Sequence, residues 1–123
     1  SVHPVEPVGF DDVGRSMASG KIETNPATTG SLCDAILTPC PGDLTFPLIA
    51  KHCGAALTVR DEDCLRAMAL AATHLKIVIE PGGAAALAAA LTQGTAFESD
   101  TLIVIASGGN VDPQILAQAL AQS

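Results

Sequence analysis

The sequence predicts an α/β protein with a mainly parallel sheet flanked by helices, and three observations support this prediction. Segments with helical apolar spacing alternate with short extended segments along the chain. The apolar run over residues 101–106 is typical of a parallel strand buried on both faces. Hydrophobic residues make up 48% of the chain, yet only three residues are aromatic, so we expect an aliphatic core with closely packed helices. A chain of 123 residues can bury one core but not two, which predicts a single domain over residues 1–123.

The first half of the chain contains short elements separated by turn-forming residues. The alternation over residues 2–5 resembles the end of a strand, and an acidic pair precedes a short helix over 13–17 that ends near Gly20. The other elements expected here are a loop over 24–31, one or two helical turns over 31–37, and a helix over 46–52 capped by Asp43 or Thr45 and ended by Gly54.

The second half alternates more regularly between strand and helix. Residues 56–59 predict a short strand, and Asp61 occupies the N-cap position of a helix that runs to about His74. The further expected elements are an extended stretch over 76–79, a helix over 83–93 begun by Pro81 and stopped by Gly94, the strand over 101–106, and a helix over 115–121 begun by Asp112 and Pro113.

Composition excludes several classes of protein. The formal charge of −7, with only six Lys and Arg residues, argues against nucleic-acid binding, which needs clustered basic side chains. No apolar run is long enough to span a membrane, and Pro4, Glu6 and Pro7 stand where a signal peptide would have basic and then apolar residues. The four cysteines form no C-x-x-C pair and are interpreted as small buried hydrophobes. We therefore expect a soluble cytoplasmic protein.

Five short motifs, in this order, resemble those of the threonine/serine dehydratases, a family that includes serine racemase and the hydroxyaspartate ammonia-lyases. The motifs are Val5-Glu6-Pro7, residues 41–46 (PGDLTF), residues 59–62 (VRDE), residues 80–85 (EPGGAA) and residues 107–112 (SGGNVD). The resemblance extends over essentially the whole chain, but over only about the last third of a typical member. It implies pyridoxal phosphate as cofactor and the tryptophan-synthase-β-like fold, also called fold type II.

Three features that the resemblance implies for a complete enzyme have no counterpart in this chain. Family members have a Schiff-base lysine in a Ser-x-Lys-x-Arg segment, a Ser-x-Gly-Asn-His loop for the substrate carboxylate, and a glycine-rich phosphate loop. The only lysines here, Lys21, Lys51 and Lys76, lack that context. We therefore expect residues 1–123 to be a partial domain, the C-terminal part of the cofactor-binding large domain. We expect this part to be inactive alone because the Schiff-base lysine and the glycine-rich phosphate loop are absent.

The resemblance assigns cofactor contacts to Ser107, Gly108 and Glu80. A serine at this position hydrogen-bonds the pyridine nitrogen of the cofactor, and because a hydroxyl is a weak proton donor, it favours β-elimination over transamination. Gly108 lets the backbone approach the ring, and Glu80 lies near it. The alternatives are ordinary structural roles: Ser107 as the end of a strand, and Glu80 as a carboxylate bonded to the amides at the start of a helix.

The resemblance also implies a cation site near the N-terminus. In relatives similar to serine racemase, a glutamate, a backbone carbonyl and an aspartate bind Mg²⁺ or Ca²⁺, and the corresponding groups here are Glu6, the carbonyl of Phe10 and Asp12. Oxygen ligands of this kind suit hard cations. The alternative is a solvated acidic turn, with Asp11 or Asp12 capping the following helix.

Two classes of function follow from these observations. The first is part of an enzyme that converts L-threonine or L-serine to a 2-oxo acid and ammonia; serine racemase and 3-hydroxyaspartate ammonia-lyase are alternatives within the family. The second is a freestanding α/β module that binds a divalent cation or a phosphorylated ligand. For the first class we expect a small amino-acid substrate, no nucleic-acid or membrane partner, and a homo-oligomer in the intact enzyme.

Overall fold

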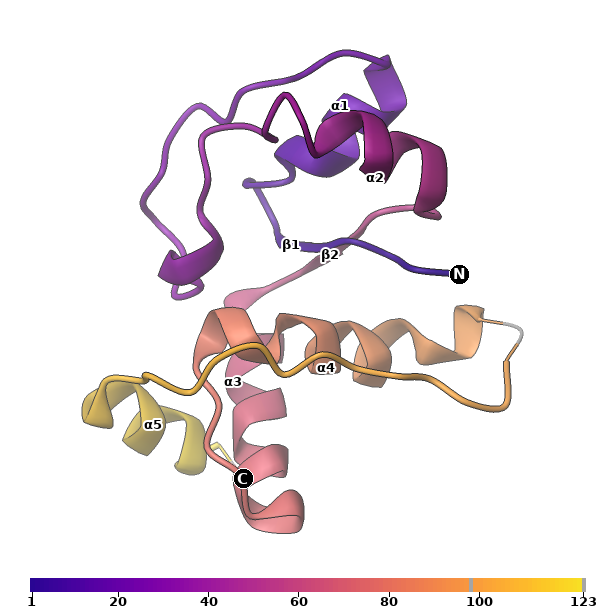
Figure 1. The fold of residues 1–123 in the computed structure, drawn as a ribbon. Helices are drawn as coiled ribbons and strands as arrows, with labels where there is room; N and C mark the ends of the chain where they lie inside the picture. The colour runs from indigo at the N-terminus through magenta and orange to yellow at the C-terminus, as the bar shows by residue number, and fades with distance from the viewer. Residues whose placement is uncertain (98, 123) are drawn as a thin grey trace.

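A computed structural model describes residues 1–97 and 99–122 (Figure 1). Its strands are β1 (Val5–Pro7) and β2 (Leu57–Val59). The helices and single helical turns, in chain order, are α1 (Asp12–Ser19), η1 (Asp34–Ile36), α2 (Phe46–His52), α3 (Asp61–Leu70), the π-helical turn η2 (Ala71–Leu75), α4 (Pro81–Gln93), η3 (Gly94–Ala96) and α5 (Pro113–Leu120). Within the described residues no helix has the length and apolar character needed to cross a membrane.

The two strands form a parallel pair at the centre of the molecule. Val5 pairs with Leu57 and Pro7 with Val59. In Figure 1, α1 and α2 lie on one side of this pair, whereas α3, α4 and α5 lie on the other. The α/β class, with a parallel sheet flanked by helices, is therefore confirmed. The first strand is displaced along the chain from the predicted 2–5, where Val2 makes only an isolated bridge with Cys53.

The core lies between α3 and α4 and consists mostly of small residues, as the composition predicted. Alanines at positions 67, 71, 84, 88 and 119 are completely buried. The largest fully buried side chain among the described residues is Met68, at 1% exposure. Small side chains let helix backbones approach closely, because the distance between packed helices depends on the residues at the contact. The alanines therefore allow α3 to pack closely on α4, and α4 in turn contacts both β1 and β2.

The helix ends mostly agree with their sequence signals. Gly20, in the left-handed region at φ 75°, ends α1, and Gly94 follows α4. Asp112 caps α5, since its carboxylate accepts a hydrogen bond from the Gln114 amide at 2.7 Å. Thr45 precedes α2, although its hydroxyl donates to the Gly42 carbonyl instead of accepting from a helix amide.

The predicted N-cap role of Asp61 is wrong. Asp61 is the first residue of α3, and Asp63 accepts the hydrogen bond from the Arg60 amide at 3.2 Å. The Asp61 carboxylate faces an earlier turn instead, where it accepts from the Ser31 hydroxyl at 2.5 Å and the Leu32 amide at 3.0 Å. The reason is tertiary: residues 31–33 pack against the start of α3 and offer donors that the local sequence does not reveal.

The predicted strand over 101–106 is also wrong for the chain as described. None of its residues belongs to a strand, and Ile103 and Ile105 are 87% and 69% exposed. The stretch over 76–79 likewise contains no strand. A strand is defined by hydrogen bonds to a neighbour, and within residues 1–97 and 99–122 no ladder forms with either segment. Both segments have the composition of strands but lack, among the described residues, a neighbouring strand with which to form hydrogen bonds.

Candidate functional site

The turn over residues 107–110 packs backbone against backbone on the start of α4. The Glu80 amide donates a hydrogen bond to the Gly108 carbonyl at 3.0 Å. A Cβ atom added to Gly83 would lie 2.5 Å from the Gly108 oxygen and 2.9 Å from its nitrogen, so no side chain fits between them. A Cβ on Gly109 would likewise lie 2.6 Å from the Val78 oxygen. Glycine is required at Gly83 and Gly109 because of this close approach.

Glu80 is half-buried beside this turn, and its side chain is directed towards Gly108. A Cβ added to Gly108 would collide with the Glu80 carboxylate. The same carboxylate makes no capping hydrogen bond to the amides of α4. The structure therefore does not support the alternative that Glu80 serves as a carboxylate bonded to helix amides. It brings Glu80 and Gly108, two of the predicted cofactor residues, into contact.

Ser107, the third predicted residue, precedes this contact directly and is exposed. Its hydroxyl has no hydrogen bond to any other group within the described part of the chain, so it is available to a ligand. Pyridoxal phosphate needs a polar group at its ring nitrogen and a close approach of backbone. The exposed Ser107 hydroxyl fits the first of these needs. The glycines beside it allow the backbone to approach α4, since a Cβ there would meet atoms of this chain.

Glu6, the first residue of the predicted cation site, lies at the start of α1. Its carboxylate is buried and accepts hydrogen bonds from the Val13 and Gly14 amides, both at 2.8 Å. Burial raises the pKa of Glu6 above its ordinary value; the two amides oppose this effect, and the charges of Asp12 and Asp11 add to it. Glu6 therefore caps α1 from a distance in sequence. Neither Asp11 nor Asp12 takes this role, since α1 has no side-chain cap from Asp11.

Asp12 is 1% exposed, and its two carboxylate oxygens differ in their surroundings. Oδ1 accepts a hydrogen bond from Asn25 Nδ2 at 2.6 Å, whereas Oδ2 is buried with no partner among the described residues. Asn25 also donates to the Thr38 carbonyl at 2.9 Å and accepts from Arg15. Asn25 could not be predicted as part of this cluster, because a polar residue in a turn-rich stretch has no periodic signal. The unpartnered Oδ2 is the feature of this cluster that fits a cation.

A conventional cluster of ligands does not accompany Asp12. The described residues contain no group of three or more His, Cys, Asp or Glu side chains placed to hold a metal. The predicted set contains two carboxylates and the backbone carbonyl of Phe10. Phe10 is half-buried, and its amide donates to the Pro7 carbonyl at 2.9 Å. The cation site therefore stays a prediction with one supporting feature, the Oδ2 atom.

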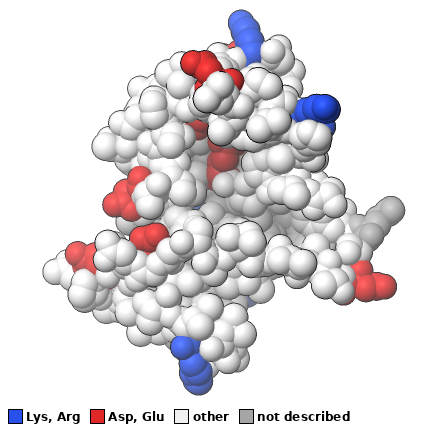
Figure 2. Space-filling model, in the orientation of Figure 1, with Lys and Arg blue, Asp and Glu red and all other residues white. Residues whose placement is uncertain are grey.

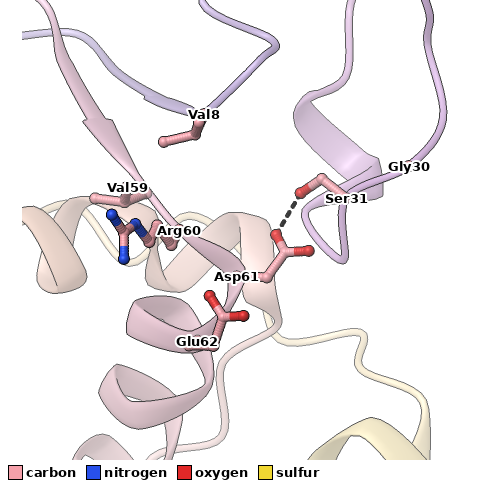
Figure 3. Close-up of a pocket in the computed structure, with 7 residues that line it drawn as sticks. All are labelled: Val8, Gly30, Ser31, Val59, Arg60, Asp61 and Glu62. Atoms are coloured by element: carbon pink, nitrogen blue, oxygen red, sulfur yellow. Dashed lines mark hydrogen bonds between the residues drawn. The ribbon is translucent and has the colours of Figure 1, made fainter.

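Two hollows lie outside the cofactor residues. The smaller, of about 160 Å³, lies at the carboxyl ends of β1 and β2 beside the Ser31–Asp61 hydrogen bond (Figure 3). The larger, of about 520 Å³, lies beside α1 and includes Glu6 and Arg15 in its lining. On the face shown in Figure 2, some acidic atoms are recessed near the centre, other acidic side chains lie nearer the edges, and the prominent Lys and Arg side chains lie apart from one another at the periphery.

The sequence profile described as pyridoxal-phosphate dependent enzyme matches residues 1–108. Serine racemase from Dictyostelium discoideum is 38% identical over 97% of this chain and 37% of its own length. The beta-hydroxyaspartate dehydratase of Paracoccus denitrificans is 37% identical over 87% of the chain and 33% of its own. The crystal structure of a threonine deaminase from T.th. superimposes with a TM-score of 0.83 at 39% identity, over 88% of this chain and 39% of that one.

The chain therefore belongs to the pyridoxal-phosphate dependent enzyme family, with relatives among racemases, deaminases and dehydratases, and its fold is that of fold type II. It spans little more than a third of the length of the curated relatives it matches.

Proposed function

We propose that residues 1–123 form one wall of the cofactor site in a pyridoxal-phosphate-dependent ammonia-lyase that acts on L-threonine or L-serine. The observation that supports this proposal is the packing of the 107–110 turn on the start of α4, which brings Gly108 against Glu80 and leaves the Ser107 hydroxyl exposed. Family membership supplies the cofactor, and the exposed hydroxyl supplies the group that would meet it.

In this proposal each residue has a separate task. When bound, pyridoxal phosphate supplies an electron-withdrawing ring for bond cleavage next to the substrate amine. The Ser107 hydroxyl hydrogen-bonds the ring nitrogen, and because it is a weak acid it leaves that nitrogen largely unprotonated. Gly108 keeps the backbone close to the ring, and the Glu80 amide and carboxylate hold Gly108 in place.

The lysine that binds the cofactor is proposed to lie outside this chain. Lys21, Lys51 and Lys76 are all exposed. Lys76 Nζ hydrogen-bonds the Thr73 carbonyl at the end of the π-helical turn, and Lys21 forms an ion pair with Glu23 at 3.9 Å. None of these three lysines lies in the turn that contains Ser107. If a borohydride-trapped cofactor mapped to one of them, this part of the proposal would be wrong.

The test is a visible-absorption titration of the purified intact protein, which includes the cofactor-binding lysine, with pyridoxal phosphate, together with an assay of 2-oxo acid release. We expect Ser107→Ala to lower the rate at least about tenfold and to change the absorption of the bound cofactor. Ser19→Ala, at an exposed helix end, is the matched control and should leave both unchanged. An unchanged absorption spectrum and rate in Ser107→Ala would exclude contact between Ser107 and the cofactor.

The choice of substrate is proposed separately. Relatives named for serine racemase, beta-hydroxyaspartate dehydratase and threonine deaminase match to similar extents, so the two alternatives within the family are serine racemase and 3-hydroxyaspartate ammonia-lyase. Incubation with L-threonine, L-serine and L-threo-3-hydroxyaspartate, followed by chiral analysis and 2-oxo acid assay, separates them. Pyruvate or 2-oxobutyrate as the main product supports the dehydratase; D-serine as the main product would replace it with the racemase.

A cation at Asp12 is the second part of the proposal. Glu6, the Phe10 carbonyl and Asp12 would bind Mg²⁺ or Ca²⁺, with Asp12 Oδ2 as the free ligand atom, and the role would be structural or activating. Calorimetric titration with CaCl₂ should show binding to the wild type and to Asp11→Asn, and no binding to Asp12→Asn. Thermal unfolding checks that both variants are folded. Equal titration of the two variants would show that the region is only an acidic turn.

We also propose that the intact protein is a homo-oligomer, as the resemblance implies, and that it lies in the cytoplasm, as the composition indicates. Sedimentation velocity of the intact protein would test the first point. A single monomeric species at micromolar concentration would contradict it.

A further inference from the structure

Two buried thiols lie in contact, and the proposed enzyme does not use either of them. Cys33, in the turn before η1, and Cys64, near the start of α3, are both completely buried. Their Sγ atoms are hydrogen-bonded to each other across 3.6 Å. The other two cysteines, Cys40 and Cys53, are half-exposed and form no disulfide.

The surrounding hydrogen bonds hold the two thiols in this arrangement. Ser31 Oγ accepts from the Cys33 amide at 3.1 Å and donates to Asp61, in the first turn of α3. The Leu32 amide donates to the same carboxylate. The turn over residues 31–33 is therefore fixed to α3 immediately beside Cys64. A disulfide bond needs the sulfur atoms about 1.5 Å closer than the observed 3.6 Å, a change that side-chain rotation and a small backbone shift can supply.

We propose that Cys33 and Cys64 form a reversible disulfide when the protein meets a peroxide. The Cys33 thiolate attacks one oxygen of hydrogen peroxide, the O–O bond breaks and hydroxide leaves, which gives a sulfenic acid at Cys33. The Cys64 sulfur then displaces hydroxide from that sulfenic acid, and its proton leaves with the hydroxide as water. Two thiols and one peroxide thus give one disulfide and two waters.

The electrostatics of the pair assign the two roles. The hydrogen bond with Cys64 lowers the pKa of Cys33 in spite of its burial. The hydrogen bond with Cys33 and burial raise the pKa of Cys64 well above its ordinary value. Cys33 is thus the thiol of the pair that loses its proton more readily, and the thiolate is the attacking species in such reactions.

The cross-link would connect elements close to the proposed cofactor wall. The residues after Cys33 form η1, whose Ala35 and Ile36 side chains lie against Gly82 at 3.5–3.6 Å from the position of a Cβ there. Gly82 is two residues from Glu80. A covalent bond between the residue before η1 and α3 would therefore restrain the start of α4 as well, without contact between either sulfur and the cofactor residues.

The experiment uses the double variant Cys40→Ser/Cys53→Ser, in which Cys33 and Cys64 are the only thiols in this segment. The folded protein is treated with hydrogen peroxide, and intact mass, peptide mapping and thermal unfolding are measured before and after dithiothreitol. We expect the loss of two hydrogen atoms, a peptide cross-link between residues 33 and 64, and a rise in Tm of roughly 5 °C that dithiothreitol reverses. Cys64→Ser in the same background is the control and should show neither cross-link nor rise.

Two results would overturn the proposal. One is full alkylation of both cysteines after peroxide treatment and unfolding, which would show that no disulfide had formed. The other is a cross-link that appears only when circular dichroism shows the protein already unfolded, which would show that the native contact does not direct the reaction. Neither result depends on cofactor binding or lyase activity, so the fate of the proposed function is decided separately.

Discussion

The helical layer of α3 and α4 and the segment over residues 101–106 are similarly apolar in sequence, yet they differ in burial. Ala67, Met68, Ala84 and Ala88 are buried between the two helices, whereas most side chains of the segment are exposed. A helix satisfies its backbone hydrogen bonds internally and needs only a surface on which to pack. A strand needs a neighbouring strand for the same bonds. Apolar composition therefore predicts burial reliably only where the hydrogen bonds are local.

Residues 107–110, which follow that segment, keep a defined position although residues 101–106 make no strand hydrogen bonds in the described chain. Residues 107–110 are held by one backbone hydrogen bond and by glycines that allow close approach to α4. This contact needs no parallel partner, because α4 supplies the surface. The candidate cofactor wall is thus positioned by the helical layer and not by a sheet.

The largest expected effect comes from truncation in the helical layer. Met68→Ala should lower the free energy of unfolding by about 3 kcal/mol, because it removes a fully buried side chain and leaves a cavity. Ile103→Ala, in the exposed segment, should change it by less than about 0.5 kcal/mol. Urea unfolding of both variants measures the contrast. Equal losses would mean that residues 101–106 are buried in solution by a contact outside the described chain.

The next largest effect is expected from alanine substitution at Gly83, where α4 meets the 107–110 segment, with Gly82 as the matched position. Alanine favours a helix over glycine, but at Gly83 its Cβ would collide with the Gly108 backbone, so Gly83→Ala should cost about 2 kcal/mol and weaken cofactor binding. At Gly82 the nearest atom would be 3.5 Å away, and Gly82→Ala should be neutral or slightly stabilising. Thermal unfolding and the absorption of bound cofactor, measured for both variants, compare these effects. Similar behaviour of the two variants would show that the turn does not pack on α4.

A smaller effect is expected at the start of α5, a local element that follows the exposed segment. Asp112→Ala removes the side-chain acceptor of the Gln114 amide and should cost about 1 kcal/mol, whereas Asp112→Asn should cost only a few tenths. Urea unfolding compares the two. If the alanine variant kept wild-type stability, α5 would be held by its packing on α3 alone.

The smallest effect is a pH dependence from Glu6 in the packed region. Because burial raises its pKa, the native state binds the proton more tightly than the unfolded state does. The stability that this proton binding contributes to the native state is therefore present in full below the ordinary pKa near 4.5. It is lost as pH rises through the higher native pKa. The difference in Tm between wild type and Glu6→Gln, measured from about pH 4 to 7, should move in favour of Glu6→Gln as pH rises. A difference that stays constant over this range would contradict the raised pKa.

Much of the fold was predictable because its signals are local. Helix ends at Gly20 and Gly94, the cap at Asp112 and the aliphatic core all followed from residue types and spacing. The candidate cofactor residues could be named from motifs, and the structure brings Glu80 and Gly108 together beside Ser107.

The features that sequence reasoning missed all depend on contacts between distant residues. Glu6 caps α1, Asp61 holds the 31–33 turn, and Asn25 fixes one oxygen of Asp12. Of these side chains only Asp61 had a predicted local role, the N-cap of α3, and the structure replaces it with a contact to a distant turn. No periodicity marks such a pair, since the donor lies on another element.

The sequence by itself determined the α/β class, the helices and the family, because apolar spacing, capping residues and short motifs act over a few neighbouring positions. Tertiary structure alone decided which carboxylate meets which amide, that two cysteines 31 residues apart touch, and that the apolar segment over 101–106 forms no strand in the described chain. The physical reason is the same in each case: a hydrogen bond or a buried contact needs a partner, and only the folded chain determines where that partner lies.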